Sequence, residues 1–188
     1  MATELFPNAG AAAGAAEPTT DDGKVLDLSS KIDKASCYAF NEAVHGSWAN
    51  LLMGDSRLGC QSDADEQLIV HIAFQEFVKI KYLQLQAFND NADPEKNPSQ
   101  IHLYVNRENL GFEDAADVDP TQTLHLTSED LKDRPIPLKY VKYQRVKSLT
   151  LFIEDNQGGE VSALGGLKIF GRPVQSTNMA EFQKKPEG

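Results

Sequence analysis

The feature that most constrains the fold is a series of short segments, beginning at residue 67, in which apolar and polar residues alternate. Alternation with a period of two places the apolar side chains on one face of a β-strand. Asn, Asp, Pro or Gly bounds the segments, as is typical of strands joined by turns. They are QLIVHIAF (67–74), VKIKYLQLQAF (78–88), IHLYVN (101–106), TQTLHLT (121–127), IPLKYVKY (136–143), SLTLFIED (148–155) and LGGLKIFG (164–171). At least seven strands without a strand–helix rhythm predict an all-β sandwich or jelly roll.

Two of these segments allow more detailed predictions. In 67–74 both faces are largely apolar, so we expect this strand to be covered on both sides for part of its length. In 78–88 the inward positions run through Val78, Ile80 and Tyr82 and then switch to Leu83, Leu85 and Ala87. The switch predicts a bulge or bend near Tyr82, of the kind found where sandwich strands change sheet.

Before these strands the chain has a different character. Residues 1–23 are rich in Ala and Gly and contain four acids but no Lys or Arg, which predicts a disordered arm. Residues 25–52 predict two short helical turns, with Trp48, Leu51 and Leu52 at helical spacing. Neither a signal peptide nor an apolar run of about 20 residues is present, so we expect no membrane association.

Length and charge narrow the classes of function. A chain of 188 residues with 40 % hydrophobic residues suits one domain plus tails. Its net charge of −10 disfavours non-specific binding to nucleic acid. Cys37 and Cys60 are too few for a disulfide scaffold and have no zinc spacing, which favours the reduced cytoplasm or nucleus.

Each candidate motif for catalysis or for a cofactor has a simpler structural interpretation, which we prefer. Ser56 in GDSRLG lacks the G-x-S-x-G elbow and an Asp three residues before any His. His71, His102 and His125 are interpreted as lying apart on outward strand faces rather than around a metal. Trp48 is interpreted as a core or rim aromatic. We therefore predict a non-enzymatic protein without a cofactor.

Two charged regions remain as candidate surfaces. RPIPLKYVKYQRVK (134–147) interleaves five cations with two tyrosines and, in so acidic a chain, is a better candidate for docking an acidic protein surface than a nucleic acid. SDADE (62–66) and EDNQGGE (154–160) hold carboxylates in predicted loops. If these two loops were adjacent, a structural calcium would be one open possibility. Otherwise the acids accept turn N–H groups and solvate the start of a strand.

Several longer blocks resemble those of the PITH domain, a proteasome-interacting module found in thioredoxin-like proteins and as a free-standing protein. The blocks are DKASCYAFNEA, SDADEQLIVHIAF, PTQTLHLTSEDL, IPLKYVKYQRVKSLTLFIEDNQGGE and FGRPVQSTNMAEF, in unbroken order from about Val25 to Phe182. The resemblance implies a galactose-binding-like jelly-roll β-sandwich, here with short N-terminal helical turns. It also implies a non-catalytic role. We expect no thioredoxin domain before the blocks, so the redox activity of the full-length relatives is not carried over.

These considerations predict a PITH domain over residues 24–175, between the arm (1–23) and a C-terminal tail (176–188). The predicted function is that of an adaptor that docks on the proteasome or a comparable large cytosolic assembly. A structural subunit of a cytoskeletal or axonemal assembly, located in the cilium, and a lectin-like module stay open as alternatives. The predicted contact residues are Asp63, Asp65, Glu66, Asn156, Gln157, Gly158, Gly159, Glu160, Thr177, Asn178, Met179 and Phe182.

Overall fold

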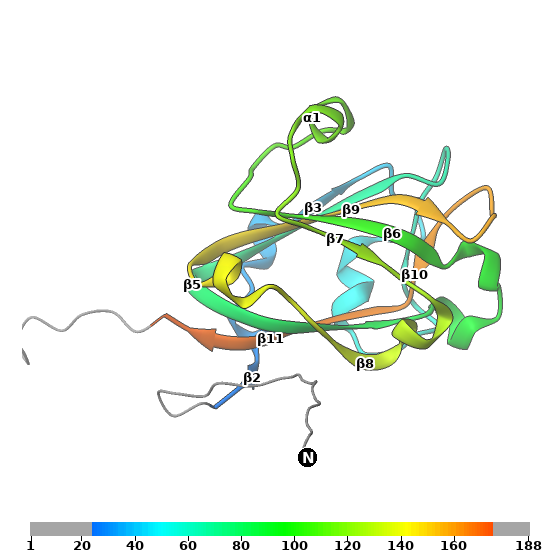
Figure 1. Ribbon diagram of the computed structural model, residues 1–188. Coiled ribbons are helices and arrows are strands. Elements are labelled where there is room, and N and C mark those ends of the chain that lie inside the picture. Colours follow the sequence, from blue (N-terminus) through cyan, green and yellow to red (C-terminus); the bar gives the residue numbers. More distant parts are fainter. Residues whose placement is uncertain (1–23, 175–188) are drawn as a thin grey trace, which may run out of the picture.

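The computed structural model describes residues 24–174 and shows two layers of antiparallel strands (Figure 1). The strands are β2 (Leu26–Asp27), β3 (Tyr38–Phe40), β4 (Cys60–Gln61), β5 (Leu68–Gln86), β6 (Pro98–Val105), β7 (Gln122–His125), β8 (Lys132–Pro137), β9 (Val146–Asn156), β10 (Ala163–Leu164) and β11 (Gly166–Pro173). One α-helix, α1 (Phe112–Asp117), and the short 3-10 turns η2 (Leu28–Lys31), η3 (Lys34–Ser36), η4 (Trp48–Leu52), η5 (Phe88–Asn91), η6 (Pro94–Lys96), η7 (Ser128–Leu131) and η8 (Tyr140–Tyr143) connect them. The predicted arm (1–23) and tail (176–188) lie outside the described residues.

Strand β5 belongs to both layers of the sandwich. Its first part pairs with β3 and β9, and its second part pairs with β8 and β11. The register with β9 shifts between Ala73 and Val78, where β5 passes from one layer to the other. In Figure 1, β3, β9, β6 and β7 form the upper layer, and β2, β11 and β8 form the lower one.

A β-bulge interrupts the second part of β5, as predicted near Tyr82. Phe170 of β11 faces Tyr82, whereas the next residue, Gly171, faces Ile80, so Lys81 is the extra residue. An extra residue moves all following side chains to the other face, which accounts for the switch in apolar parity. The side chains of Leu83 and Leu85 therefore return to the core.

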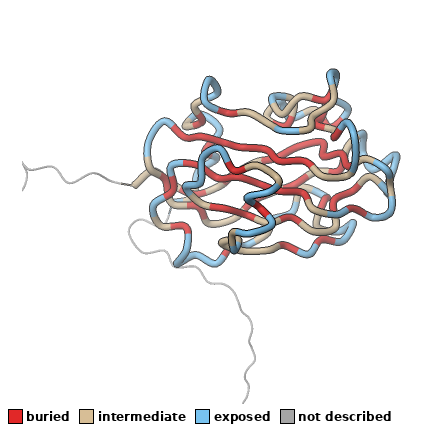
Figure 2. Tube along the Cα trace, turned by 90° about the horizontal axis from the view of Figure 1, so that it is seen from above, coloured by how far each residue is buried: buried red, intermediate tan, exposed pale blue. Residues whose placement is uncertain are grey.

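The main core fills the space between the two layers. Apolar side chains of β5, β6, β9 and β11 alternate into it, and Leu28, Ile32 and Leu51 close it from the N-terminal turns. Figure 2 shows the buried positions along the strands and the exposed positions gathered in the connecting loops. The helical turns predicted in 25–52 are confirmed as 3-10 turns, and Trp48 packs against the rim of this core.

A second, smaller cluster lies on the outer face of the upper layer. Ile69 of β5, Tyr104 of β6 and Phe152 of β9 pack there against Leu110 and Ala115, from the segment that includes α1. The beginning of β5 is consequently buried on both faces, which confirms the prediction for 67–74.

The strand predicted over 136–143 is wrong in its position. Strand β8 ends at Pro137, and the chain turns through η8, with Leu138 N donating to Lys81 O. In this turn Tyr143 is buried, whereas Tyr140 is 40 % exposed. No helix within residues 24–174 is long and apolar enough to cross a membrane.

Candidate functional site

The acidic loop that leads into β5 is held by one asparagine. Asn41 adopts a left-handed conformation (φ 69°), and its Nδ2 donates to Asp65 Oδ1 (3.0 Å) and Gln67 O (2.7 Å). Its Oδ1 accepts the N–H of Ala64 (3.1 Å), and Asp65 Oδ1 also accepts the N–H of Gln67 (3.0 Å). The Asp65 carboxylate therefore shapes the turn.

The neighbouring acids of this loop behave differently from Asp65. The side chain of Asp63 is exposed and that of Glu66 is partly exposed. Neither carboxylate forms a hydrogen bond or an ion pair with another residue in the part of the chain that the structure describes. Of the three predicted carboxylates, these two are available to a partner.

The second predicted loop is organised around Asn156, whose side chain is buried. Its Nδ2 lies 3.0 Å from Gly159 O, 3.0 Å from Val161 O and 3.2 Å from Ser162 Oγ, and its Oδ1 accepts the N–H of Gly158 (3.0 Å). Gly158 has φ +116°, a conformation that favours glycine. Asn156 and Gly158 thus shape this loop.

Ser162 joins the two predicted loops. Its Oγ donates to Glu66 O (2.7 Å), its N–H donates to Ser62 Oγ (2.8 Å), and its carbonyl accepts the N–H of Ser62 (2.9 Å). Since Ser62 and Ser162 are both buried, the two loops share one buried, hydrogen-bonded base. We call residues 62–67 together with 156–162 the acidic loop end, which lies on the right in Figure 1.

The acidic loop end presents carboxylates without forming a metal site. Glu160 is exposed and adds a carboxylate to those of Asp63 and Glu66. Gln157 is exposed, although its Nε2 donates to Leu126 O, and the N–H of Gly159 donates to Glu95 O. No group of three or more His, Cys, Asp or Glu side chains within the described range is placed to hold a metal ion. The predicted contact residues in the tail, Thr177, Asn178, Met179 and Phe182, lie outside the described residues.

Ser56 and His102, two of the remaining sequence candidates, have local structural partners. Ser56 Oγ donates to Asp90 Oδ1 (2.6 Å) rather than facing a histidine. His125 is exposed. His102 contacts Thr123 Oγ1 (2.7 Å) and the Glu154 carboxylate.

His71 lies on the outer face of its strand, as expected, but that face is covered there. This side chain is buried, stacks on Tyr38 with ring centroids 4.5 Å apart, and lies 2.8 Å from Thr150 Oγ1. Burial lowers the pKa of His71, and the nearby Glu108 opposes this shift. The segment between β6 and α1 covers this face of the sheet, because Thr150 Oγ1 donates to Arg107 O.

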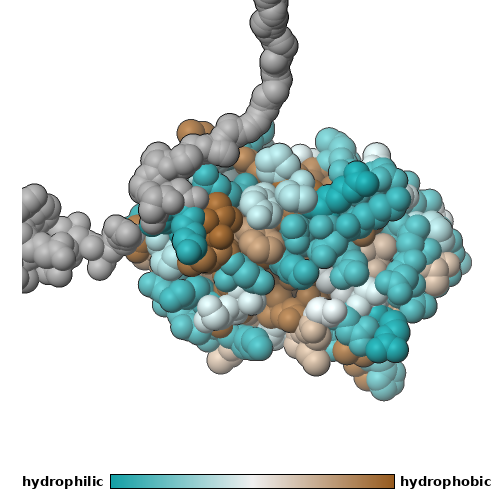
Figure 3. Space-filling model, turned by 90° about the horizontal axis from the view of Figure 1, so that it is seen from below, coloured by the Kyte–Doolittle hydropathy of each residue, from teal (hydrophilic) through white to brown (hydrophobic). Residues whose placement is uncertain are grey.

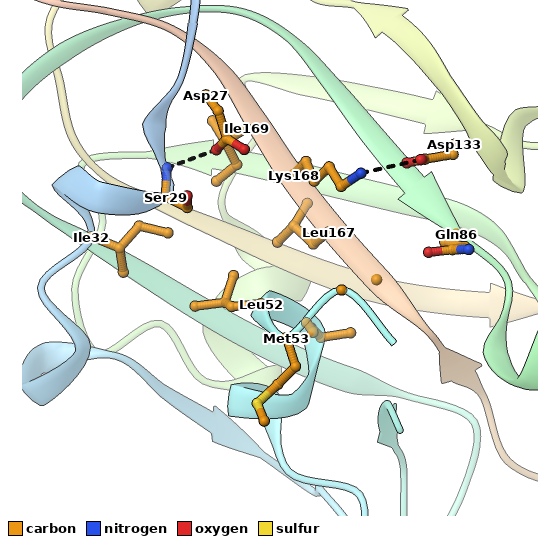
Figure 4. A pocket seen from close by; sticks show the side chains of 13 residues that line it. Asp27, Ser29, Ile32, Leu52, Met53, Gln86, Asp133, Leu167, Lys168 and Ile169 are labelled. Atoms are coloured by element: carbon orange, nitrogen blue, oxygen red, sulfur yellow. Dashed lines mark hydrogen bonds and ion pairs between the residues drawn. The ribbon is translucent and has the colours of Figure 1, made fainter. Parts of the chain in front are cut away.

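Two hollows were not predictable from the sequence, because each forms where one segment covers another. One, of about 410 Å³, lies between α1 and the upper sheet, next to His102, Glu154 and Asp119. The other, of about 100 Å³, lies between η4 and β11 (Figure 4). Figure 3 shows the molecule from below, with hydrophobic surface among mainly hydrophilic side chains. The second hollow is much smaller than the ~300–1,000 Å³ of typical ligand sites.

The rim of this smaller hollow is closed by two local contacts. The Ser29 N–H donates to Asp27 Oδ1 (2.9 Å) on one side, and Lys168 Nζ contacts Asp133 Oδ2 (3.2 Å) on the other. Leu52 and Met53 form the wall opposite β11 (Figure 4). The arrangement leaves a shallow apolar groove without a converging set of polar groups.

Comparison with protein-family models matches residues 18–187 to the PITH domain. The chain belongs to the PITH domain family. It is 38 % identical over 128 residues to "Thioredoxin-like protein 1" of Schizosaccharomyces pombe, covering 66 % of this chain and 43 % of that protein. It is 29 % identical over 143 residues to "PITH domain-containing protein GA19395" of Drosophila pseudoobscura pseudoobscura, covering 73 % of this chain and 65 % of that protein. With "PITH domain-containing protein 1" of Homo sapiens the identity is 27 % over 151 residues, covering 78 % and 69 %. The chain thus spans less than two thirds of the first two relatives.

Solved structures place the PITH domain among galactose-binding-like jelly rolls. The CBM32-1 and CBM32-2 domains of Clostridium perfringens ZmpB, in complex with GalNAc, match with a TM-score of 0.61 at 12 % identity, covering 78 % of this chain and 36 % of that one. The family 32 CBM of C. perfringens NanJ, in complex with galactose, matches with a TM-score of 0.57 at 5 % identity, covering 78 % and 99 %. The predicted fold is confirmed. At these identities the likeness concerns the fold alone.

Proposed function

We propose that this PITH domain is a non-catalytic protein–protein interaction module, an adaptor that associates with the proteasome or a comparable large cytosolic assembly. Membership of the family supports the module, and none of the family names that the chain matches is that of a catalytic family. The observation that carries the proposal is the acidic loop end, where Asp63, Glu66 and Glu160 project from a base already fixed by Ser162. Prearranged loops lower the entropy cost of binding.

The test is recovery of bound proteins from native cells. Tagged wild-type protein and the variant D63A/E66A/E160A are purified at physiological salt, and the associated proteins are identified by mass spectrometry. We expect the wild type to retain subunits of one large assembly and the variant to lose most of them. Asp65 is left unchanged, because its loss would disturb the loop itself.

A matched control separates contact from a general change in charge. The variant E108A/E113A/D117A removes three exposed acids in and just before α1, none of them among residues 62–67 and 156–162. Equal losses in both variants, or no loss in either, would remove the acidic loop end from the proposal. A truncation of residues 175–188 tests the contact residues predicted in the tail.

Two other outcomes would change the class of function. Retention in a salt-resistant particle favours a structural subunit over an adaptor. Specific signals on a glycan array, absent from the variant D63A/E66A/E160A, would favour a lectin-like module, as the fold of its structural neighbours permits. Residues 62–67 and 156–162 contain no aromatic side chain on which a sugar ring could stack.

A further inference from the structure

A second surface lies at the opposite end of β9 from the acidic loop end. Residues 77–87 contain two lysines and no acid, and residues 135–153 contain four cations and no acid. The fold brings these two stretches together, because Val78 pairs with Val146 and Tyr82 pairs with Pro137. We call the six cations the basic cluster: Lys79, Lys81, Lys139, Lys142, Arg145 and Lys147.

Aromatic rings and backbone carbonyls, not carboxylates, hold four of these cations. The guanidinium of Arg145 lies 3.9 Å from the ring centroid of Phe77, and Lys147 Nζ lies 5.7 Å from the same centroid. Lys147 Nζ also donates to Gln75 O (3.0 Å). Cation–π contacts of this kind fix the position of a cation without neutralising it.

The other half of the basic cluster surrounds η8. Lys81 Nζ lies 5.0 Å from the ring centroid of Tyr140, and Lys142 Nζ donates to Thr121 O (3.2 Å). Tyr140 is 40 % exposed and Val141 is 80 % exposed. The side chains of Tyr140 and Val141 thus expose apolar surface among the cations.

Internal counter-charges are absent throughout the basic cluster, whereas six other cations of the described chain have one. Elsewhere Lys31, Arg57, Lys96, Lys132, Arg134 and Lys168 all pair with carboxylates. No member of the basic cluster forms an ion pair within residues 24–174. In a chain with 28 acids and 18 Lys and Arg, this local excess of positive charge lacks an internal explanation.

We propose that the basic cluster, with Tyr140 and Val141, docks an acidic segment of a partner protein. Carboxylates of the partner would meet the cations, and an apolar side chain would cover Tyr140 and Val141. Tyr and Arg are enriched among the residues that dominate binding energy at interfaces. Pro135 and Pro137 lie on β8, the edge strand beside the cluster, so the segment binds through side chains rather than as an added strand.

A nucleic acid is the less suitable occupant. Single-stranded binding needs open aromatic faces for base stacking. Arg145 and Lys147 both lie against the Phe77 ring, and Lys81 lies over Tyr140. The net charge of −10 also opposes a long polyanion more than a short acidic segment.

The proposal deepens the proposed interaction function and rests on it, but it is independent of the acidic loop end.

The probe is a fluorescein-labelled peptide of five glutamates on either side of one leucine, titrated with the full chain and followed by fluorescence anisotropy. The variant K139E/K142E alters two lysines that make no contact with a ring. The control K34E/K132E makes the same change of charge at exposed lysines outside the cluster.

We expect K139E/K142E to weaken peptide binding about tenfold or more and the control to weaken it much less. Arg145→Gln, checked for an unchanged urea midpoint, should also weaken binding. Equal weakening in both charge variants, or no binding by the wild type, would overturn the proposal. Tighter binding of a single-stranded DNA of equal charge would overturn it in favour of a nucleic acid. Since the peptide assay contains no cell-derived assembly, its failure leaves the native pull-down unaffected.

Discussion

The role of Asn156 as the centre of its loop leads to a quantitative prediction. Its NH₂ group has two hydrogens, shared among the oxygens of Gly159, Val161 and Ser162, and its Oδ1 accepts one N–H from Gly158. Asn156→Ala therefore removes about three hydrogen bonds. At about 1 kcal/mol each, the free energy of unfolding should fall by about 3 kcal/mol. For a chain of this size, that lowers Tm by roughly 6–12 °C.

Urea unfolding, followed by the fluorescence of Trp48, measures this loss directly, because the chain has one tryptophan. Glu160→Ala is the matched control, since Glu160 lies in the same loop and is exposed, and it should change stability by less than about 0.5 kcal/mol. Asn156→Asp keeps an acceptor for Gly158 but turns a negative oxygen towards carbonyl oxygens, so it should cost at least as much as alanine. Coincident midpoints for Asn156→Ala and Glu160→Ala would refute the assigned role.

Three further predictions concern buried groups. Burial raises the pKa of Cys60 to about 12 and also raises that of Cys37, so neither thiol should react with iodoacetamide at pH 8 until the protein is unfolded; rapid native labelling would contradict this. Burial lowers the pKa of His71, so the unfolded state binds a proton first and stability should fall as pH drops below about 6.5, less steeply in His71→Gln; parallel pH profiles would argue against it. A Cβ on Gly171 would lie 1.8 Å from Lys79 O, so Gly171→Ala should cost more than about 3 kcal/mol in urea unfolding, and a wild-type midpoint would show that the bulge can relax.

The sequence predicts those parts of the fold that leave a periodic signal. The bulge at Lys81 is visible because it shifts every following apolar residue of β5. The strand predicted over 136–143 failed because apolar alternation continues after Pro137, although the chain there has left the edge of β5. Alternation in the sequence does not show which backbone groups are paired.

The candidate site was only partly predictable for a related reason. The loops at 62–66 and 154–160 could be identified as acidic from the sequence, but their contact through Ser162 depends on how β4, β5, β9 and β10 are ordered in space. Asp65 differs in role from Asp63 and Glu66 because its carboxylate accepts a hydrogen bond from Asn41. Asn41 lies more than twenty positions away along the chain. Such roles become visible only with the pairing in place.

Strand β9 has a consequence for how the molecule approaches others. Its 11 residues span roughly 35 Å, with the basic cluster beyond one end and the acidic loop end at the other. The molecule therefore carries a permanent electric dipole along β9 in addition to its net charge. In the field of an acidic partner, such a dipole turns the basic end of the molecule towards the partner before contact. The torque acts over the ~8 Å screening length of physiological salt. It favours this one orientation of approach, although the net charge alone would repel an acidic partner.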